Sequence, residues 1–421
     1  MLLALITATI IGIALAGYLW LVSDHDFATT RSLAWNAAMP VAEAGVDEAL
    51  TQLYYAGVTN LSANSWTSAG TGWFYKERYV DSGSYYQVAI QQADPPVIVS
   101  TGYVPAPRSS ASYVKRRVRV NTQRQWLFGK GVAAKGAVDL AGNDLSTDSF
   151  DSSDSLFSTN GKYDSAKALD HGDAGTNSEL INSLSGGNAN IKGRISTGPG
   201  GTMAIGANGS VGDRAWVESG TPGIKPGWSS DDMHVEIQDV SEPFTSGYST
   251  PGSGTDNGTN YTWVLDTGNY RLSGFGGQVL VKGNSVLWVT DSVNFDTSDY
   301  IYIAPGATLA IYVSAPTATF GRVYNSDGFA LSFQYFGLPS NSAVELKANA
   351  SYVATLYAPE AAFTLGGGDT NDYDFVGACV VNTVKLNGHY HFHFDEALRK
   401  TGAPSRGYVV SGWSEVDPNG P

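Results

Sequence analysis

The chain begins with a long run of apolar side chains. Residues 1–22 (MLLALITATIIGIALAGYLWLV) contain no charged residue. A helix rises about 1.5 Å per residue, so this segment is about 30 Å long as a helix, enough to cross the hydrocarbon core of a bilayer. Its large apolar side chains are the candidates for contacts with a membrane or with other helices: Leu2, Leu3, Leu5, Ile6, Ile10, Ile11, Ile13, Leu15, Leu19, Leu21 and Val22.

The helical pattern continues beyond the apolar segment, to about Tyr55. One stripe of this second half is apolar and carries Ala38, Ala42, Val46, Leu50 and Leu53. We therefore predict a single helix over residues 1–55, apolar in front and amphipathic behind. Gly12 and Gly17 weaken the apolar half, and Pro40 is expected to bend the helix because proline removes an intrahelical hydrogen bond.

A cleaved signal peptide and a simple membrane anchor are the alternatives for this segment. A signal peptide has a basic region before its apolar stretch, whereas here no Lys or Arg precedes Arg31. Positive charges normally hold the cytoplasmic end of a span, so their absence favours prior removal of a short basic leader, with Met1 as the mature N-terminus. A single-span anchor stays open as an alternative.

Residues 56–126 alternate between polar and apolar positions. Four runs predict antiparallel strands packed as a small sheet on the amphipathic helix: WFYKERYV, SYYQVAIQQ, PPVIVSTGYV and ASYVKRRVRVNTQRQW. The KRRVRV run contains Lys115, Arg117 and Arg119 among valines. This alternation favours a solvated strand face over a nucleic-acid site, and a second use would be to meet acidic surface on a neighbouring subunit.

Residues 127–398 show no helical periodicity. Short apolar strands recur with Gly, Asn and Asp corners, and their spacing of about 20–25 residues favours a parallel β-helix. A β-sandwich is the alternative. The predicted fold class is therefore α+β: a long N-terminal helix, a small antiparallel sheet and a large mostly-β domain. Residues 389–398 and the tail at 399–421 are expected to cover the last coil, with the small sheet covering the first.

The composition of the chain limits the kinds of partner molecule that are expected. The chain carries 25 basic and 39 acidic residues, a net charge of −14, which disfavours nucleic acid. Charged residues make up only 15% of a chain with 49 glycines, as expected for β structure with many tight turns. The single cysteine, Cys379, cannot form an intrachain disulfide and is expected in a buried strand.

Candidate chemistry is sparse. Acidic residues occur in three separate clusters: Asp148, Asp151 and Asp154; Asp231 and Asp232; and Asp369, Asp372 and Asp374. The last cluster, which includes Asn371, offers oxygen ligands for calcium but lacks the EF-hand pattern. His389, His391 and His393 alternate with aromatic residues, so all three imidazoles share one strand face, where neighbouring pairs could bridge a metal.

We expect the histidines instead to face solvent while the aromatic residues enter the core. We therefore predict no catalytic residue, cofactor or metal, and no enzyme activity. A polysaccharide-cleaving β-helix enzyme is the least favoured alternative, because it needs paired carboxylates that the sequence does not show. Five Asn-x-Ser/Thr triplets permit glycosylation, at Asn60, Asn208, Asn257, Asn260 and Asn349.

Two resemblances accompany this pattern. Residues 2–50, ending in AAMPVAEAGVDEAL, resemble the N-terminal region of PilX-like minor pilins and related type IV pilins. Pilins usually carry a glutamate near the mature N-terminus, where this chain has Leu5. The phrases KGAVDLAGN, TLYAPEAAFTLGGGD, FVGACVVNTVKLNG and HFHFDEAL, with the GWSEV ending, resemble a domain of unassigned function often found behind such helices.

These resemblances imply a filament protein. The expected function is a structural subunit of an extracellular type IV pilus-like filament, in which copies polymerise through the apolar helix and display the β-rich head. The expected partners are other copies of the chain, the pilus or secretion-type assembly machinery, and the inner membrane before assembly. The alternative is a minor tip pilin or a membrane-anchored adhesin that binds glycans or surfaces.

Overall fold

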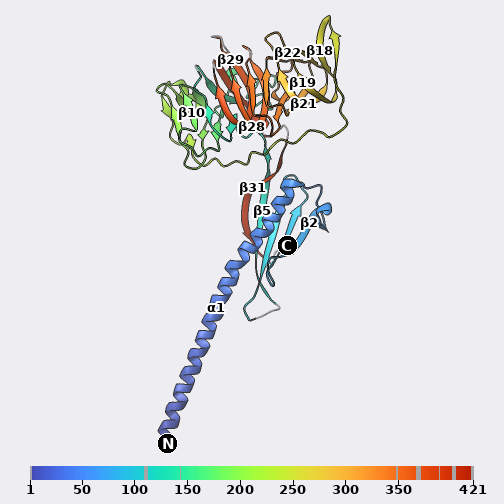
Figure 1. Cartoon of the computed structure of the whole chain (residues 1–421). Coiled ribbons are helices and arrows are strands. Elements are labelled where there is room, and N and C mark those ends of the chain that lie inside the picture. Colours follow the sequence, from blue (N-terminus) through green and yellow to red (C-terminus); the bar gives the residue numbers. More distant parts are fainter. Residues whose placement is uncertain are drawn as a thin grey trace. The chain divides into compact units, whose positions relative to one another are not determined.

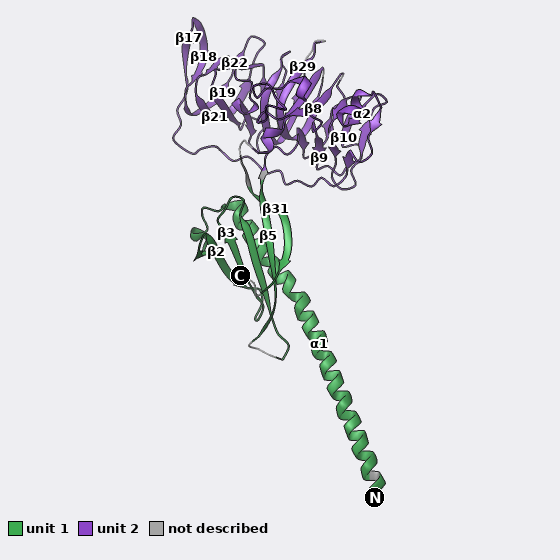
Figure 2. Cartoon of the chain, turned by 180° about the vertical axis from the view of Figure 1, so that it is seen from behind, with its two compact units in different colours: residues 1–125, 404–421 green, residues 126–403 purple. Residues whose placement is uncertain are grey.

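The computed structural model describes residues 2–108, 112–142, 144–347, 349–366, 371–387, 389–400 and 404–418. The chain forms two compact units (Figure 2). Unit 1 contains residues 1–125 and 404–421, and unit 2 contains residues 126–403. The predicted α+β class is confirmed, with a long helix, a small antiparallel sheet and a large β domain.

Helix α1 (Leu2–Tyr55) is the first element of unit 1 (Figure 1). It is long and apolar enough to cross a membrane. Gly12, Gly17 and Pro40 all lie within this α-helix. The helix is therefore continuous through the three positions where a bend was expected, and bending in an assembled state stays a prediction.

The small sheet has six strands in the order β1-β2-β3-β4-β5-β31. Its strands are β1 (Thr67–Gly70), β2 (Trp73–Tyr79), β3 (Tyr85–Gln91), β4 (Val97–Pro105), β5 (Tyr113–Trp126) and β31 (Pro404–Val416), with the short 3-10 helix η1 (Ser62–Asn64) before them. Strands β1 to β5 pair antiparallel in chain order. The four predicted strands are confirmed as β2 to β5, whereas β1 and β31 were not predicted.

Small residues let α1 approach the sheet closely. A Cβ atom at Gly102 would lie 2.3 Å from the Ala38 carbonyl oxygen and 2.5 Å from the Ala42 nitrogen, so only glycine fits there. A Cβ atom at Gly45 of α1 would likewise lie 2.3 Å from the Ser100 hydroxyl oxygen on β4. Around this contact the core of unit 1 buries Ala42, Val46, Ala49, Leu53, Leu61, Trp66, Tyr86, Val88, Ile90, Ile98, Val118 and Val120.

The C-terminal segment corrects an expectation. Residues 399–421 were expected to cover an end of the β-helix, but β31 instead completes the small sheet beside β5. Two hydrogen bonds of 2.7 Å join the Arg116 guanidinium to both carboxylate oxygens of Glu415 on β31. Unit 2 is therefore an insertion between two neighbouring strands of unit 1.

Unit 2 is a parallel β-helix, as predicted. Its first half contains β6 (Val132–Ala134), β7 (Val138–Asp139), β8 (Ser146–Phe150), β9 (Ala174–Thr176), β10 (Leu184–Gly187), β11 (Asn190–Lys192), β12 (Ile195–Ser196), β13 (Met203–Ile205), β14 (Ser210–Gly212), β15 (Gly223–Ile224) and β16 (Ser229–Ser230), with η2 (Ser165–Lys167) and α2 (Arg214–Glu218) between strands. The pairings β6–β9, β9–β12 and β12–β16 are all parallel, so successive coils stack on one another.

The second half follows an irregular connection over residues 231–251. It contains β17 (Gly252–Asp256), β18 (Thr259–Leu265), β19 (Gly268–Phe275), β20 (Gln278–Val281), β21 (Asn284–Asn294), β22 (Tyr300–Ile303), β23 (Thr308–Val313), β24 (Thr317–Phe320), β25 (Arg322–Asn325), β26 (Phe333–Gly337), β27 (Ala343–Leu346), β28 (Tyr352–Leu365), β29 (Tyr373–Leu386) and β30 (Tyr390–Asp395), with η3 (Ala330–Ser332) and η4 (Glu396–Arg399). Parallel pairing runs from β19 through β21, β23, β26 and β28 to β29. Only β17 and β18 pair antiparallel among the described strands of this half.

The order of the coils in space differs from their order in the chain. The last coil stacks on the first, with Cys379 of β29 beside Val132 of β6 and Phe392 of β30 beside Thr147 of β8. Residues 389–395 were expected at the free end of the stack, and this is wrong. Because the two ends of unit 2 meet inside the β-helix, Arg399 Nε lies 3.1 Å from the Gly129 carbonyl oxygen.

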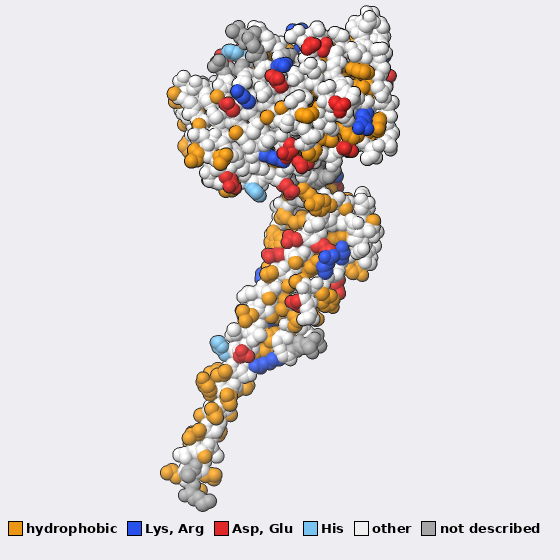
Figure 3. All heavy atoms as spheres, viewed as in Figure 1, with side chains coloured by type: hydrophobic (Ala, Val, Ile, Leu, Met, Phe, Trp, Pro, Cys, Tyr) orange, Lys and Arg blue, Asp and Glu red, His pale blue; other side chains and the backbone are white. Residues whose placement is uncertain are grey.

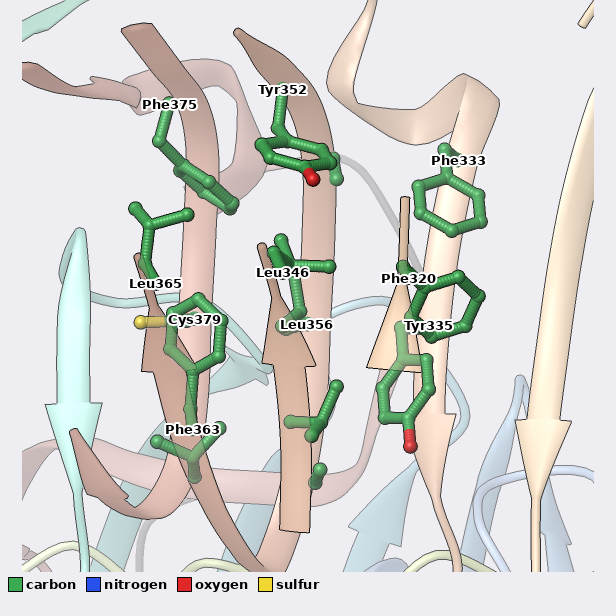
Figure 4. Close-up of a cluster of buried hydrophobic side chains, with 14 of the residues drawn as sticks. Phe320, Phe333, Tyr335, Leu346, Tyr352, Leu356, Phe363, Leu365, Phe375 and Cys379 are labelled. Atoms are coloured by element: carbon green, nitrogen blue, oxygen red, sulfur yellow. The ribbon is translucent and has the colours of Figure 1, made fainter. Parts of the chain in front are cut away.

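A continuous core runs through the coils. Figure 4 shows aromatic rings and aliphatic side chains from neighbouring strands packed together: Phe320, Phe333, Tyr335, Leu346, Tyr352, Leu356, Phe363, Leu365 and Phe375. Cys379 lies in this cluster, fully buried, as the sequence predicts. Burial raises the pKa of its thiol, which keeps it protonated and unreactive.

Candidate assembly surface and the buried histidine network

The two halves of α1 have opposite environments. From Ala34 onward the helix buries Ala34, Ala38, Ala42, Val46, Ala49 and Leu53. All eleven apolar residues predicted for assembly are exposed, from 46% for Ile6 and Val22 to 77% for Leu2 and Leu3. The first half of the helix therefore finds no apolar partner among the described residues of its own chain (Figure 3).

Four further large side chains of α1 are exposed and were not among the eleven predicted residues. Tyr18 is 64% exposed and Trp20 is 73% exposed. Leu33 and Trp35, beyond the apolar segment, are also exposed. The signal for Tyr18 and Trp20 was in the sequence, since both belong to the charge-free segment and aromatic residues are common where a span meets water.

Residues 2–22 of α1 form no polar face. Its threonines satisfy their hydroxyls within the helix: Thr7 donates to the Leu3 carbonyl at 3.1 Å, and Thr9 donates to the Ile6 carbonyl at 2.8 Å. A helix that is apolar all round is stable only in a membrane or among other helices. This segment is the candidate assembly surface.

Arg108 marks the end of the apolar segment. It follows β4, and its Nη2 donates to the carbonyl and hydroxyl oxygens of Ser23 at 2.8 and 2.7 Å. The guanidinium also lies 5.3 Å from the Phe27 ring centre. Arg108 therefore reaches the helix directly after Val22, where the apolar segment ends.

Glu48 fastens the second half of α1 to the sheet. Its carboxylate forms ion pairs with Lys76 at 3.0 Å and Arg78 at 2.8 Å, and Tyr86 donates a hydrogen bond to it. Burial raises the pKa of Glu48, but hydrogen bonds from Tyr86 and Lys76 and the two cationic charges outweigh it and lower the pKa. The carboxylate is ionised at neutral pH and holds the helix on β2 and β3.

His389, directly before β30, and His391 and His393 within it have different environments. The predicted entry of Tyr390, Phe392 and Phe394 into buried positions is found. The expectation that the histidines face solvent is wrong for His393, which is only 4% exposed. The Tyr163 ring stacks on its imidazole with ring centres 3.6 Å apart, so a loop of the first half covers it.

His393 bridges two carboxylates from the two halves of the β-helix. Its Nδ1 lies 2.5 Å from Asp148 Oδ1 on β8, and its Nε2 lies 3.2 Å from Asp374 Oδ1 on β29. Tyr163 also donates to Asp148, at 2.8 Å. Burial lowers the pKa of His393, but the hydrogen bonds and charges of the two carboxylates raise it more, and the net shift is upward. In turn the hydrogen bond from His393 lowers the pKa of Asp374.

The other two histidines have separate partners. The Nδ1 atom of His391 lies 2.7 Å from the Ser146 hydroxyl. The Nδ1 atom of His389 lies 3.5 Å from Asp144 and 3.6 Å from Asp372. The three imidazoles therefore have different partners, and the arrangement ties β30 to β8 and β29.

Of the candidate carboxylates, Asp148 and Asp374 are brought together on the two nitrogens of His393, and the others that the structure describes lie apart. Asp151 and Asp154 accept hydrogen bonds from backbone nitrogens in their own turns, and Asp231 and Asp232 are exposed elsewhere. Of the calcium candidates, Asp372 and Asp374 pair with different histidines, and Asp369 lies outside the described residues. Within the described ranges, no group of three His, Cys, Asp or Glu side chains is arranged to hold a metal ion. That the chain is no enzyme and binds no cofactor stays a prediction.

All five glycosylation triplets are accessible. Their asparagines are exposed in both units: Asn60, Asn208, Asn257, Asn260 and Asn349. Exposure is a requirement for glycan attachment and does not show that it occurs.

Comparison with known families gives one match. Residues 230–401 match a family described as a domain of unknown function (DUF7305). The match begins at the irregular connection and ends after η4, so it covers the second half of the β-helix. It contains the phrases quoted above from β28 to β30, but it does not reach KGAVDLAGN, GWSEV or the pilin-like helix. No curated protein and no solved structure matches the chain.

Proposed function

We propose that the chain is a structural subunit of an extracellular type IV pilus-like filament. In this proposal the first half of α1 is held in the inner membrane before assembly and is buried among the same helices of other subunits afterwards. The assembly machinery transfers the subunit between these two environments. Unit 1 fixes the second half of α1, and the β-helix is displayed outward.

The observation that carries this proposal is the exposure of residues 2–22 in an otherwise well-packed chain. Burying one large apolar side chain contributes about 1.5–3 kcal/mol. Eleven such side chains supply tens of kcal/mol per subunit before the entropic cost of association. Because Leu5 replaces the glutamate usual in pilins, apolar packing is the main driving force in this proposal.

The insertion of unit 2 fits display of a head. Its two ends leave from adjacent strands, β5 and β31, and meet again inside the β-helix, so a large domain is added without changing the helix-and-sheet packing. Residues 1–125 and 404–421 contain equal numbers of acidic and basic side chains, so the net charge of −14 belongs to unit 2. A strongly acidic head keeps displayed copies soluble.

A membrane-anchored surface protein, such as an adhesin, is the second candidate. The observation in its favour is the pair of exposed aromatic residues, Tyr18 and Trp20, at the end of a segment of bilayer length. A minor tip pilin would share the exposed aromatic pair and the segment of bilayer length. Filament formation separates the candidates, because an anchored protein stays in the membrane fraction as single copies.

Substitution of Ile10 by Arg tests the proposal. Ile10 is 60% exposed in the isolated chain, so the change leaves both folded units intact, but an unpaired charge in a membrane or a helix bundle is strongly unfavourable. We expect loss of surface filaments counted by electron microscopy. Asp231→Arg, at an exposed position of the head, is the matched control and should assemble normally. Normal filaments from the Ile10 variant would refute the proposal.

A further inference from the structure

Unit 1 has two layers whose outer surfaces carry opposite charge. In the helix layer, Ala42, Val46 and Ala49 face the sheet. On the same helix, Glu43 and Asp47 are exposed, one turn apart. The outward surface of the helix layer is therefore acidic.

The outer surface of the sheet layer is basic. On β5, Val118 and Val120 are buried beneath α1, so Lys115, Arg117 and Arg119 point to the other face. They lie opposite Tyr103, Thr101 and Val99 of β4. On β2, Glu77 offsets one of these three charges, and Gln87 donates a hydrogen bond of 2.8 Å to it.

An aromatic cluster lies beside the basic residues. The Tyr85 and Tyr103 rings stack with centres 4.4 Å apart and planes 2° from parallel. Tyr79 lies 5.1 Å from Tyr85, and Tyr113 lies 5.2 Å from it edge-on. Tyr79 is 61% exposed and Tyr113 is 37% exposed, so the face offers ring surface that a partner can bury.

Several charges of unit 1 form ion pairs within the unit. Glu48 pairs with Lys76 and Arg78, Arg116 with Glu415, and Arg124 with Asp94. Among the described residues, Lys115 and Arg119 have no carboxylate within 4.0 Å, and Asp47 has no cation within that distance. Lys115 and Arg119 therefore leave positive charge on the outer surface of the sheet, and Asp47 leaves negative charge on the outer surface of the helix.

We propose that unit 1 of one subunit packs against unit 1 of the next, with the basic sheet face on the acidic helix face. In this contact Lys115 and Arg119 meet Glu43 and Asp47 of the second copy, and the tyrosine cluster is buried. The two faces differ, so the contact is heterologous and repeats without closing, as a filament requires. The inference rests on the proposed function and adds the contact that orders neighbouring subunits.

The acidic head is the competing occupant for the basic face. Packing of the apolar segments places corresponding parts of neighbouring chains at similar levels, which favours contact between copies of unit 1. The heads carry the whole net charge and repel one another, so an attractive contact is required elsewhere. Both arguments favour the helix face over the head.

A charge exchange in the full-length chain tests the proposal. The Lys115→Glu/Arg119→Glu variant and the Glu43→Lys/Asp47→Lys variant each place like charges in the contact. We expect each to reduce filament yield about tenfold. The chain that combines all four changes restores opposite charges and should recover wild-type yield. Circular dichroism and thermal unfolding of each variant confirm that unit 1 folds.

Each outcome of this test is decisive. Recovery in the combined variant supports the contact, because a general loss of solubility or folding would not be rescued by further charge changes. Normal assembly of either two-residue variant, or loss without recovery, overturns it, including the case in which the basic face meets the head. Failure of the proposed function is distinguishable, since the wild-type chain would then form no filaments.

Discussion

Substitution of His393 by Gln is expected to destabilise the β-helix where its two halves meet. The imidazole is buried and holds Asp148 and Asp374 on its two nitrogens, at 2.5 and 3.2 Å. Gln is uncharged and can donate from only one end, so at least one carboxylate loses its partner. The Asp148 side chain is only 8% exposed, and it carries most of the cost.

The magnitude follows from the burial of the pair. Removing one partner of a buried ion pair costs about 3–5 kcal/mol, and about 3 kcal/mol applies here because the Asp374 side chain is 48% exposed. In a domain of this size this lowers Tm by about 6–12 °C. His391→Gln is the matched control: it removes one hydrogen bond with Ser146, worth about 1 kcal/mol.

The effect depends on pH with a defined sign. The pKa of His393 is raised in the folded state, so its contribution is complete below about pH 6.5, the usual value for histidine, and is lost as pH rises through the folded pKa. The pKa of Asp374 is lowered, so its contribution is present above about pH 3.9 and is lost as pH falls through its folded value. The difference in Tm between wild type and variant is therefore largest between these limits.

Calorimetry of the detergent-solubilised chain from acidic to alkaline pH measures this difference. NMR titration of the His393 ring reports its pKa directly. A His393 pKa at or below 6.5, or equal Tm losses for His393→Gln and His391→Gln, would refute the account of this network.

Two further predictions concern packing. Gly102→Ala should cost unit 1 about 1–3 kcal/mol, because the added Cβ meets backbone atoms of Ala38 and Ala42, whereas Gly12→Ala, with nothing within 4 Å, should slightly stabilise α1. Phe363→Ala should cost unit 2 about 3–5 kcal/mol, because removal of a ring that is 1% exposed leaves a cavity in the core. Helix α1 should be unaltered. Chemical denaturation followed by circular dichroism measures the stability of each variant. A Gly102→Ala or Phe363→Ala chain as stable as wild type would contradict the packing described.

The elements with strong local patterns were predictable. The apolar segment and the stripe with Ala42 and Val46 predicted α1, and the alternation of polar and apolar residues predicted β2 to β5. The recurrence of short strands with glycine corners gave the β-helix. In each case the hydrophobic period decides the structure of the segment itself, without reference to distant residues.

The features that depend on distant pairing were not predictable. Strand β31 is separated from β5 by the whole of unit 2, and no local pattern assigns it to the small sheet. The stacking of β30 on β8 pairs residues such as His393 and Asp148 that are far apart in sequence. The burial of His393 follows from that stacking and from the position of Tyr163 above it, so a strand-face argument alone placed it in solvent.

Deletion of residues 1–28 tests the central claim most directly. The deleted segment contains the eleven predicted apolar residues, Tyr18 and Trp20, together with the Ser23 and Phe27 contacts to Arg108, while the buried stripe of α1 is retained. Electron microscopy and analytical ultracentrifugation of the truncated and full-length chains measure assembly. The account predicts a soluble, folded monomer from the truncated chain and filaments from the full-length chain. Native-looking filaments formed by the truncated chain would contradict it.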